Sequence, residues 1–190
     1  MNLPNKLTLL RFCLVPVFLL FIYLAMPLNY MIALIVFIIA SATDALDGHI
    51  ARKHNLITDF GKFLDPLADK VLVISALVVL VDLKIMSAIP LIIIITREFM
   101  VSGLRLVVAD EGVVVPAGIW GKLKTAFTMV TIIVALLWLS ITNDFAFNMS
   151  STGKIIDIII LILIWISTIL TVISGLIYLK AFWKYIDTDK

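Results

Sequence analysis

Long apolar stretches separated by short polar segments dominate the sequence. A helix needs about 20 predominantly apolar residues to cross the hydrocarbon core of a bilayer. Several stretches approach or exceed that length, and charged residues, Gly or Pro mark their ends. The pattern predicts six membrane-spanning helices, with approximate ranges 7–26, 30–43, 63–81, 86–108, 126–141 and 155–183.

The first two stretches need a further argument. Pro4 and the mixed polarity of residues 2–10 indicate that the chain first lies along the membrane interface. The stretch 30–43 is short, but it can continue as helix through Ala51 if its acidic end faces a polar cavity instead of lipid. We therefore predict an all-α integral membrane protein, with one domain over residues 1–190, six transmembrane helices and an N-terminal interfacial segment.

Composition supports a membrane protein and excludes other classes. Hydrophobic residues make up 63% of the 190-residue chain, against about 45–50% in soluble domains. Charged residues make up 15%, against about 25%. The net charge of +2 is too small to indicate a nucleic-acid partner, and a single cysteine excludes an intrachain disulfide. Function is therefore expected from the few clusters of charged residues.

Lysine and arginine are distributed asymmetrically around the predicted spans. With six spans both chain ends lie on one side of the membrane. Of the 15 Lys and Arg residues, all except Lys84 and Lys154 fall on that side or on the helix halves nearest to it. The positive-inside rule then predicts cytoplasmic termini. Because no transit pattern marks an organelle, we expect a multi-pass protein of the plasma membrane, as in a bacterium.

Four aspartates gather at the predicted cytoplasmic ends of the second and third helices. Residues on a helix advance by about 100° each, so spacings of three and four residues share one face. A short connection favours antiparallel neighbours, so the two faces are expected to meet and to form the active site. The first face carries Asp44, Asp47, Gly48 and Ala51, and the second carries Gly61, Asp65 and Asp69.

Converging carboxylates need a cation between them. A pair of like charges about 4 Å apart costs roughly 4 kcal/mol at an effective dielectric constant of 20. Oxygen ligands without His or Cys suit Mg²⁺ or Mn²⁺, and four aspartates are enough for two ions. Asp65 also has a second interpretation, because an aspartate before a proline, here Pro66, is typical of a helix start.

Small and basic residues complete this region. Gly48, Ala51 and Gly61 remove side chains from the acidic faces, which leaves room for a ligand to approach the helix backbone. Arg52 is placed to neutralise a phosphate or to bind it through two hydrogen bonds. A diphosphate is a natural ligand here, because Mg²⁺ prefers a few carboxylates together with phosphate oxygens.

The spacing D-x2-D-G-x2-A-R-x8-G-x3-D-x3-D, from Asp44 to Asp69, resembles the motif of the CDP-alcohol phosphatidyltransferases at every fixed position. The resemblance implies two divalent metal ions held by the four aspartates, with Asp69 also acting as the general base. It implies a homodimer and a CDP-linked donor, CDP-diacylglycerol, bound between the second and third helices. The residues expected to bind the donor are Gly48, Ala51, Arg52, Gly61, Asn5 and Thr8.

Three other segments bear on the acceptor alcohol. NLPNKLTLLR at 2–11, TREFMVSGLR at 96–105 and GKLKT at 121–125 are similar to family members whose acceptor is glycerol 3-phosphate. That similarity implies formation of phosphatidylglycerophosphate and CMP. A phosphorylated acceptor needs a cationic subsite. For two of the candidate residues, Lys122 and Lys124, positive-inside topology and contact with lipid headgroups are an equally good explanation. The candidates for the acceptor phosphate are Arg97, Arg105, Lys122 and Lys124.

Two alternatives remain at this point. Within the same family, the acceptor could be inositol phosphate or another polyol phosphate. From a different class, a cation transporter could use acidic helix ends as an ion path. A transporter predicts acidic residues spread through the bilayer, whereas here they gather at one face.

Overall fold

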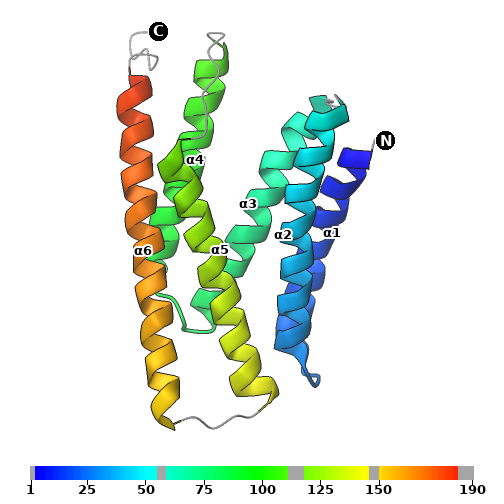
Figure 1. The fold of residues 1–190 in the computed structure, drawn as a ribbon, viewed down its shortest axis with the longest axis vertical. Coiled ribbons are helices and arrows are strands. Elements are labelled where there is room, and N and C mark those ends of the chain that lie inside the picture. The colour runs from blue at the N-terminus through cyan, green and yellow to red at the C-terminus, as the bar shows by residue number, and fades with distance from the viewer. Residues whose placement is uncertain (1–2, 55–58, 111–117, 146–149, 184–190) are drawn as a thin grey trace. The chain divides into compact units, whose positions relative to one another are not determined.

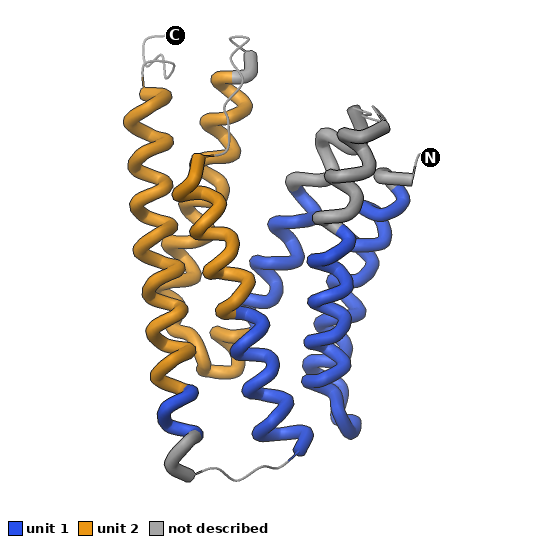
Figure 2. Tube along the Cα trace, viewed as in Figure 1, with its two compact units in different colours: residues 1–79, 132–156 blue, residues 80–131, 157–190 orange. Residues whose placement is uncertain are grey.

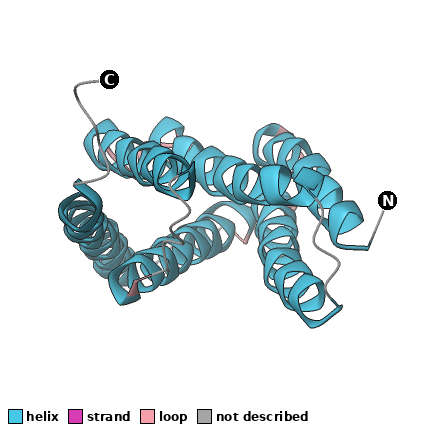
Figure 3. Ribbon diagram, turned by 90° about the horizontal axis from the view of Figure 1, so that it is seen from above, coloured by secondary structure: helices cyan, strands magenta, loops and turns pink. Residues whose placement is uncertain are grey.

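The computed structural model describes the backbone of residues 3–54, 59–110, 118–145 and 150–183, and the side chains of 6–43, 67–108, 118–145 and 153–183. Within these ranges every regular element is helical, which confirms the predicted all-α class (Figure 3). The elements in chain order are α1 (Leu3–Tyr23), α2 (Asn29–His54), α3 (Asp59–Asp82), α4 (Ala88–Asp110), α5 (Ile119–Leu139), the π-helical turn η1 (Ser140–Asp144) and α6 (Ser150–Phe182) (Figure 1).

The helix bounds test two of the sequence predictions. α2 continues to His54, so the short second apolar stretch does extend as helix through Ala51. α3 begins at Asp59, which puts Asp65 and Pro66 inside the helix. The interpretation of Asp65 as a helix start is therefore wrong, because the preceding residues already have helical backbone.

Three helices are long and apolar enough to cross a bilayer in the described part of the chain. They are Lys6–Tyr23, Ile119–Asp144 and Gly153–Phe182, and Asn29–Thr43 is a shorter apolar helix. Many large apolar side chains on these helices are exposed, including Leu20, Ile158 and Leu176. Exposed apolar surface of this kind suits contact with lipid, so the fold is that of a membrane protein.

The chain divides into two compact units (Figure 2). Unit 1 comprises Met1–Val79 and Ile132–Ile156, and unit 2 comprises Leu80–Thr131 and Asp157–Lys190. In unit 1, α1 packs along α2. The rings of Phe18 and Phe37 are fully buried there with their centroids 5.9 Å apart, and small residues on α2 such as Ala33 and Ala40 are also buried. Small side chains let helices approach closely where lipid removes the usual hydrophobic driving force.

Asp144 fixes the start of α2 from a distant part of unit 1. The first N–H groups of a helix have no partner inside the helix. The Tyr30 N–H donates to Asp144 Oδ1 at 3.4 Å, and the Met31 N–H donates to Asp144 Oδ2 at 2.8 Å. A carboxylate is also favoured at this end by the helix dipole. The carboxylate thus ties η1 to the first turn of α2.

Hydroxyl side chains join α5 to α6 in unit 2. The Thr128 and Ser167 hydroxyl oxygens lie 2.8 Å apart and share a hydrogen bond between the helices. Thr131, Thr171 and Ser174 are buried as well, and each hydroxyl donates to a carbonyl of its own helix. Such small polar residues satisfy their own groups and allow close helix contact in an apolar medium.

Replacing Asp144 with Ala should destabilise the fold, because the N–H groups of Tyr30 and Met31 lose their acceptor. We expect a loss of about 1 kcal/mol, the usual value for a helix cap, measured as a lower thermal unfolding midpoint in detergent. Asn143→Ala is the matched control, since its exposed side chain bonds only to Leu139 and Thr142 among the described residues. Equal midpoints for the two variants would show that Asp144 does not stabilise α2.

Candidate active site

The four motif aspartates lie on two continuous helices of unit 1. Asp44 and Asp47 belong to α2, and Asp65 and Asp69 belong to α3. Their spacings of three and four residues place each pair on one helix face. As metal ligands, these four residues would offer only carboxylate oxygens, which fits hard divalent ions. Asp69 is half-buried, while other predicted side chains lie outside the described ones, namely those of Asn5, Asp44, Asp47, Gly48, Ala51, Arg52, Gly61 and Asp65.

A polar face of α1 is buried in the same unit. Thr8 is 1% exposed and Arg11 is 0% exposed. Asn5 lies three positions before Thr8, so the three residues share one side of the helix. In the sequence, Arg11 is one of the 15 positive charges and the last residue of the segment at 2–11. Its complete burial in unit 1, which also contains the motif aspartates, was not foreseen.

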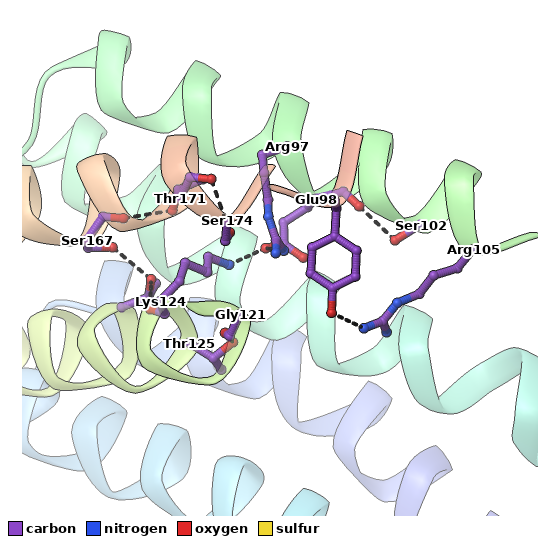
Figure 4. A network of polar contacts seen from close by, with 12 residues as sticks. Arg97, Glu98, Ser102, Arg105, Gly121, Lys124, Thr125, Ser167, Thr171 and Ser174 are labelled. Atoms are coloured by element: carbon purple, nitrogen blue, oxygen red, sulfur yellow. Dashed lines mark hydrogen bonds and ion pairs between the residues drawn. The ribbon is translucent and has the colours of Figure 1, made fainter. Parts of the chain in front are cut away.

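Unit 2 contains a second group of charged residues, arranged around a tyrosine (Figure 4). We call this group the basic cluster, and it consists of Arg97, Glu98, Arg105, Lys124 and Tyr178. Lys124 on α5 forms an ion pair with Glu98 on α4. Arg97 Nη1 lies 3.4 Å from the same carboxylate oxygen. The side chains of Arg97, Glu98 and Lys124 are only 11%, 17% and 5% exposed. One carboxylate therefore serves two buried cations.

Tyr178 connects the two arginines of the cluster. The guanidinium carbons of Arg97 and Arg105 lie 5.7 and 5.6 Å from the centroid of its ring, which is the range of cation–π attraction. Its hydroxyl accepts hydrogen bonds from Arg105 Nη2 at 3.2 Å and from the Gly118 N–H at 2.9 Å. Sequence reasoning treated this part of α6 as a simple apolar helix and missed Tyr178.

Gly175 gives Arg97 its space. A Cβ added at Gly175 would lie 3.1 Å from Arg97 Cγ and 3.2 Å from Met100 Cε, which is closer than ordinary contact. A Cβ at Gly121 would lie 3.6 Å from Arg97 Nη2, at ordinary contact distance. Gly175 and Tyr178 are three residues apart on α6 and share one face.

The structure brings together three of the four residues predicted for the acceptor phosphate. Arg97, Arg105 and Lys124 belong to the basic cluster, whereas Lys122 is exposed at the start of α5. The cluster contains three cations and one carboxylate, that of Glu98, which lies beside Arg97 and Lys124, so these residues together carry excess positive charge. Two of its cations are guanidinium groups, whose planar donors match phosphate oxygens. The arrangement is suited to an anionic ligand.

Comparison with known proteins identifies the family. Residues 1–181 match the CDP-alcohol phosphatidyltransferase family. The chain is 40% identical to the CDP-diacylglycerol–glycerol-3-phosphate 3-phosphatidyltransferase of Bacillus subtilis, with 99% of this chain and 98% of the relative covered. Proteins of the same name from Rickettsia bellii and Pseudomonas fluorescens are 40% and 39% identical, with 97% and 100% of this chain and 97% and 94% of the relatives covered.

The chain belongs to the CDP-alcohol phosphatidyltransferase family, as the motif from Asp44 to Asp69 predicted. It is a member of a family of membrane phosphatidyltransferases. This membership leaves the cation-transporter alternative without support.

Removing Glu98 alone should cost more stability than removing it together with Lys124. Glu98→Ala leaves the ammonium group of Lys124 buried without its carboxylate, and breaking a buried pair costs about 3–5 kcal/mol. The double variant Glu98→Ala/Lys124→Met removes the buried ammonium and should recover part of the loss. Thermal unfolding in detergent measures both, with Lys122→Met as the exposed-lysine control. A double variant no more stable than the single one would contradict this account.

Proposed function

We propose that the protein transfers the phosphatidyl group of CDP-diacylglycerol to glycerol 3-phosphate, which gives phosphatidylglycerophosphate and CMP. The observation that carries the proposal is the similarity, at 39–40% identity over nearly the whole chain, to relatives from three bacteria that bear the name of this reaction. The complete motif from Asp44 to Asp69 supports the same chemistry. Another acceptor, such as inositol phosphate, is the alternative within the family.

The basic cluster supports a phosphorylated acceptor. We assign the acceptor phosphate to Arg97 and Arg105, whose guanidinium groups can donate pairs of hydrogen bonds to phosphate oxygens. Lys122 and Lys124 add positive potential at the start of α5. A serine or free inositol acceptor has no phosphate to compensate this charge, so the cluster favours glycerol 3-phosphate over such alcohols.

The donor is assigned to the motif residues. Asp44, Asp47, Asp65 and Asp69 would hold two divalent ions, Mg²⁺ or Mn²⁺, which when bound supply charge neutralisation for a diphosphate. Gly48, Ala51 and Gly61 leave room for the nucleotide beside the helix backbones. Arg52 would bind a phosphate oxygen, and Asn5 and Thr8 on α1 would contact the donor.

The proposed reaction is a direct in-line displacement. The acceptor hydroxyl gives its proton to Asp69, and its oxygen forms a bond to the phosphorus that carries diacylglycerol. The bond from that phosphorus to the bridging oxygen breaks, and the oxygen leaves with CMP. No covalent bond between enzyme and substrate is needed. Asp69 lies on α3 and is half-buried.

The location proposed for the enzyme follows from the apolar stretches of the sequence and from the distribution of Lys and Arg between them. We assign six membrane spans, cytoplasmic termini and a place in the plasma membrane of a bacterium, where the positive-inside rule puts most of the 15 Lys and Arg residues in contact with the cytoplasm. A homodimer is part of the proposal, by analogy with the family. Water-soluble glycerol 3-phosphate would then reach the protein from the cytoplasm.

Release of CMP from CDP-diacylglycerol tests the reaction. Purified protein with Mg²⁺ should release CMP only when a phosphorylated acceptor is present. Within a panel of glycerol 3-phosphate, inositol phosphate, glycerol and serine, glycerol 3-phosphate should give the highest kcat/KM. A preference for another acceptor would overturn the assignment of the acceptor, and CMP release without any acceptor would indicate hydrolysis instead of transfer.

Asp69→Asn should abolish CMP release, because the amide neither accepts the proton nor carries the charge of a metal ligand. We expect a loss of at least about 10³-fold, within the range that removal of a general base produces. The wild-type enzyme should lose activity in EDTA and regain it with Mg²⁺ or Mn²⁺, whereas the variant should stay inactive at all metal concentrations. Correct membrane insertion and an unchanged thermal midpoint serve as controls, and full activity in the variant would refute the role of Asp69.

A further inference from the structure

Arg97 and Arg105 are separated by eight positions on α4. At about 1.5 Å of rise per residue, their Cα atoms are about 12 Å apart along the helix axis. A phosphate group is much smaller than this separation. Both side chains must therefore bend toward a common place before one phosphate can interact with both.

The ring of Tyr178 supplies that common place. Both guanidinium carbons lie within 5.7 Å of its centroid. Arg105 also donates to the hydroxyl oxygen at 3.2 Å. A long cationic side chain loses rotamer freedom when it binds a ligand, and this cost falls when the free protein already holds the side chain in place. Contact with one ring orders both arginines before any ligand arrives.

The hydroxyl of Tyr178 is itself held in position. It accepts a second hydrogen bond, at 2.9 Å, from the N–H of Gly118, immediately before α5. That N–H would otherwise be among the helix-start groups that lack a partner inside the helix. Phe182, one turn along α6, stacks on the Tyr178 ring at a centroid distance of 6.2 Å. The ring and the hydroxyl are thus fixed by α5 and α6, and Arg105 is fixed by the hydroxyl.

Arg97 packs against the same face of α6, one turn before Tyr178. Gly175 precedes Tyr178 by three residues, and a Cβ there would come within 3.1 Å of Arg97 Cγ. On this face of α6, Gly175 leaves room for the aliphatic part of Arg97, and the ring of Tyr178 contacts its guanidinium group. Packing against lipid requires neither feature. The face is fitted to the two arginines.

We infer that Tyr178 is a positioning residue that holds Arg97 and Arg105 as a fixed pair for the phosphate of the acceptor. This inference rests on the proposed function, since it takes the acceptor to be a phosphorylated alcohol. Tyr178 acts through the arginines and adds affinity for the acceptor. It leaves the donor and the chemical step unaffected.

Tyr178→Phe tests the inference with the smallest change. The variant keeps the ring under both guanidinium groups and removes only the hydroxyl that accepts from Arg105 and Gly118. We expect KM for glycerol 3-phosphate to rise about 10-fold, the effect of losing one hydrogen bond to a charged group. The kcat and the KM for CDP-diacylglycerol should stay at their wild-type values. The inhibition constant of inorganic phosphate, used as a competitive inhibitor, should rise in parallel with the KM for glycerol 3-phosphate.

Two further variants separate positioning from a general structural role. Tyr30→Phe removes a phenolic hydroxyl in unit 1 and should leave both KM values unchanged. In an Arg105→Ala background, Tyr178→Phe should add little to the rise in KM, because the two residues act as one pair. Additive effects in that background, or a Tyr178→Phe variant with normal KM and a reduced kcat or thermal midpoint, would overturn the inference.

Failure of the proposed function gives a different result. If the wild-type enzyme released CMP with another phosphorylated alcohol and not with glycerol 3-phosphate, the acceptor assignment would be wrong. The KM comparison between wild type and Tyr178→Phe would then be made with that alcohol and judged by the same criteria. If the enzyme used only an alcohol without phosphate, the inference about Tyr178 would fall together with the proposed function.

Discussion

The cost of placing a charge in an apolar environment constrains this chain more than any other interaction. An ion removed from water loses several kcal/mol of solvation, which is recovered only through a close partner with good geometry. Glu98 meets this constraint for Lys124 and lies beside Arg97, and the ring of Tyr178 adds a cation–π contact to Arg97. The exposed Arg105 contacts the same ring. These contacts come from three helices of unit 2. The charged residues therefore link the three helices to one another.

The same constraint applies to backbone groups. An apolar medium offers no water to the N–H groups at a helix start, so side chains from elsewhere in the fold must satisfy them. Asp144 does this for α2 in unit 1, and the hydroxyl of Tyr178 does it before α5 in unit 2. Each contact links segments that are far apart in sequence. In unit 2 the hydroxyl that accepts from the backbone N–H of Gly118 also accepts from the guanidinium group of Arg105.

The sequence was informative where the relevant interactions are local. The helical spacing of Asp44 and Asp47, and of Asp65 and Asp69, was readable from the periodicity of a helix, and the bounds of α2 and α3 agree with it. Only the second interpretation of Asp65, as a helix start, was wrong, because Asp65-Pro66 satisfies a local rule that the longer helix overrides. Tyr178 was missed because its partners Arg105 and Gly118 lie 73 and 60 positions away. A single tyrosine in an apolar helix carries no local signal of such contacts.

The positions of the two charged groups along the chain suggest how acceptor preference could change in this family. The acidic motif occupies residues 44–69 of unit 1, and the residues of the basic cluster, from Arg97 to Tyr178, all belong to unit 2. Under the proposed assignment, the first group handles the nucleotide donor and the second handles the acceptor phosphate. A substitution at Gly175 or Tyr178 would alter how the arginines are held while every motif residue stayed intact. On this assignment, a change in α6 would alter acceptor preference and leave the residues proposed for the donor unchanged, because Gly175 and Tyr178 lie outside the motif at 44–69.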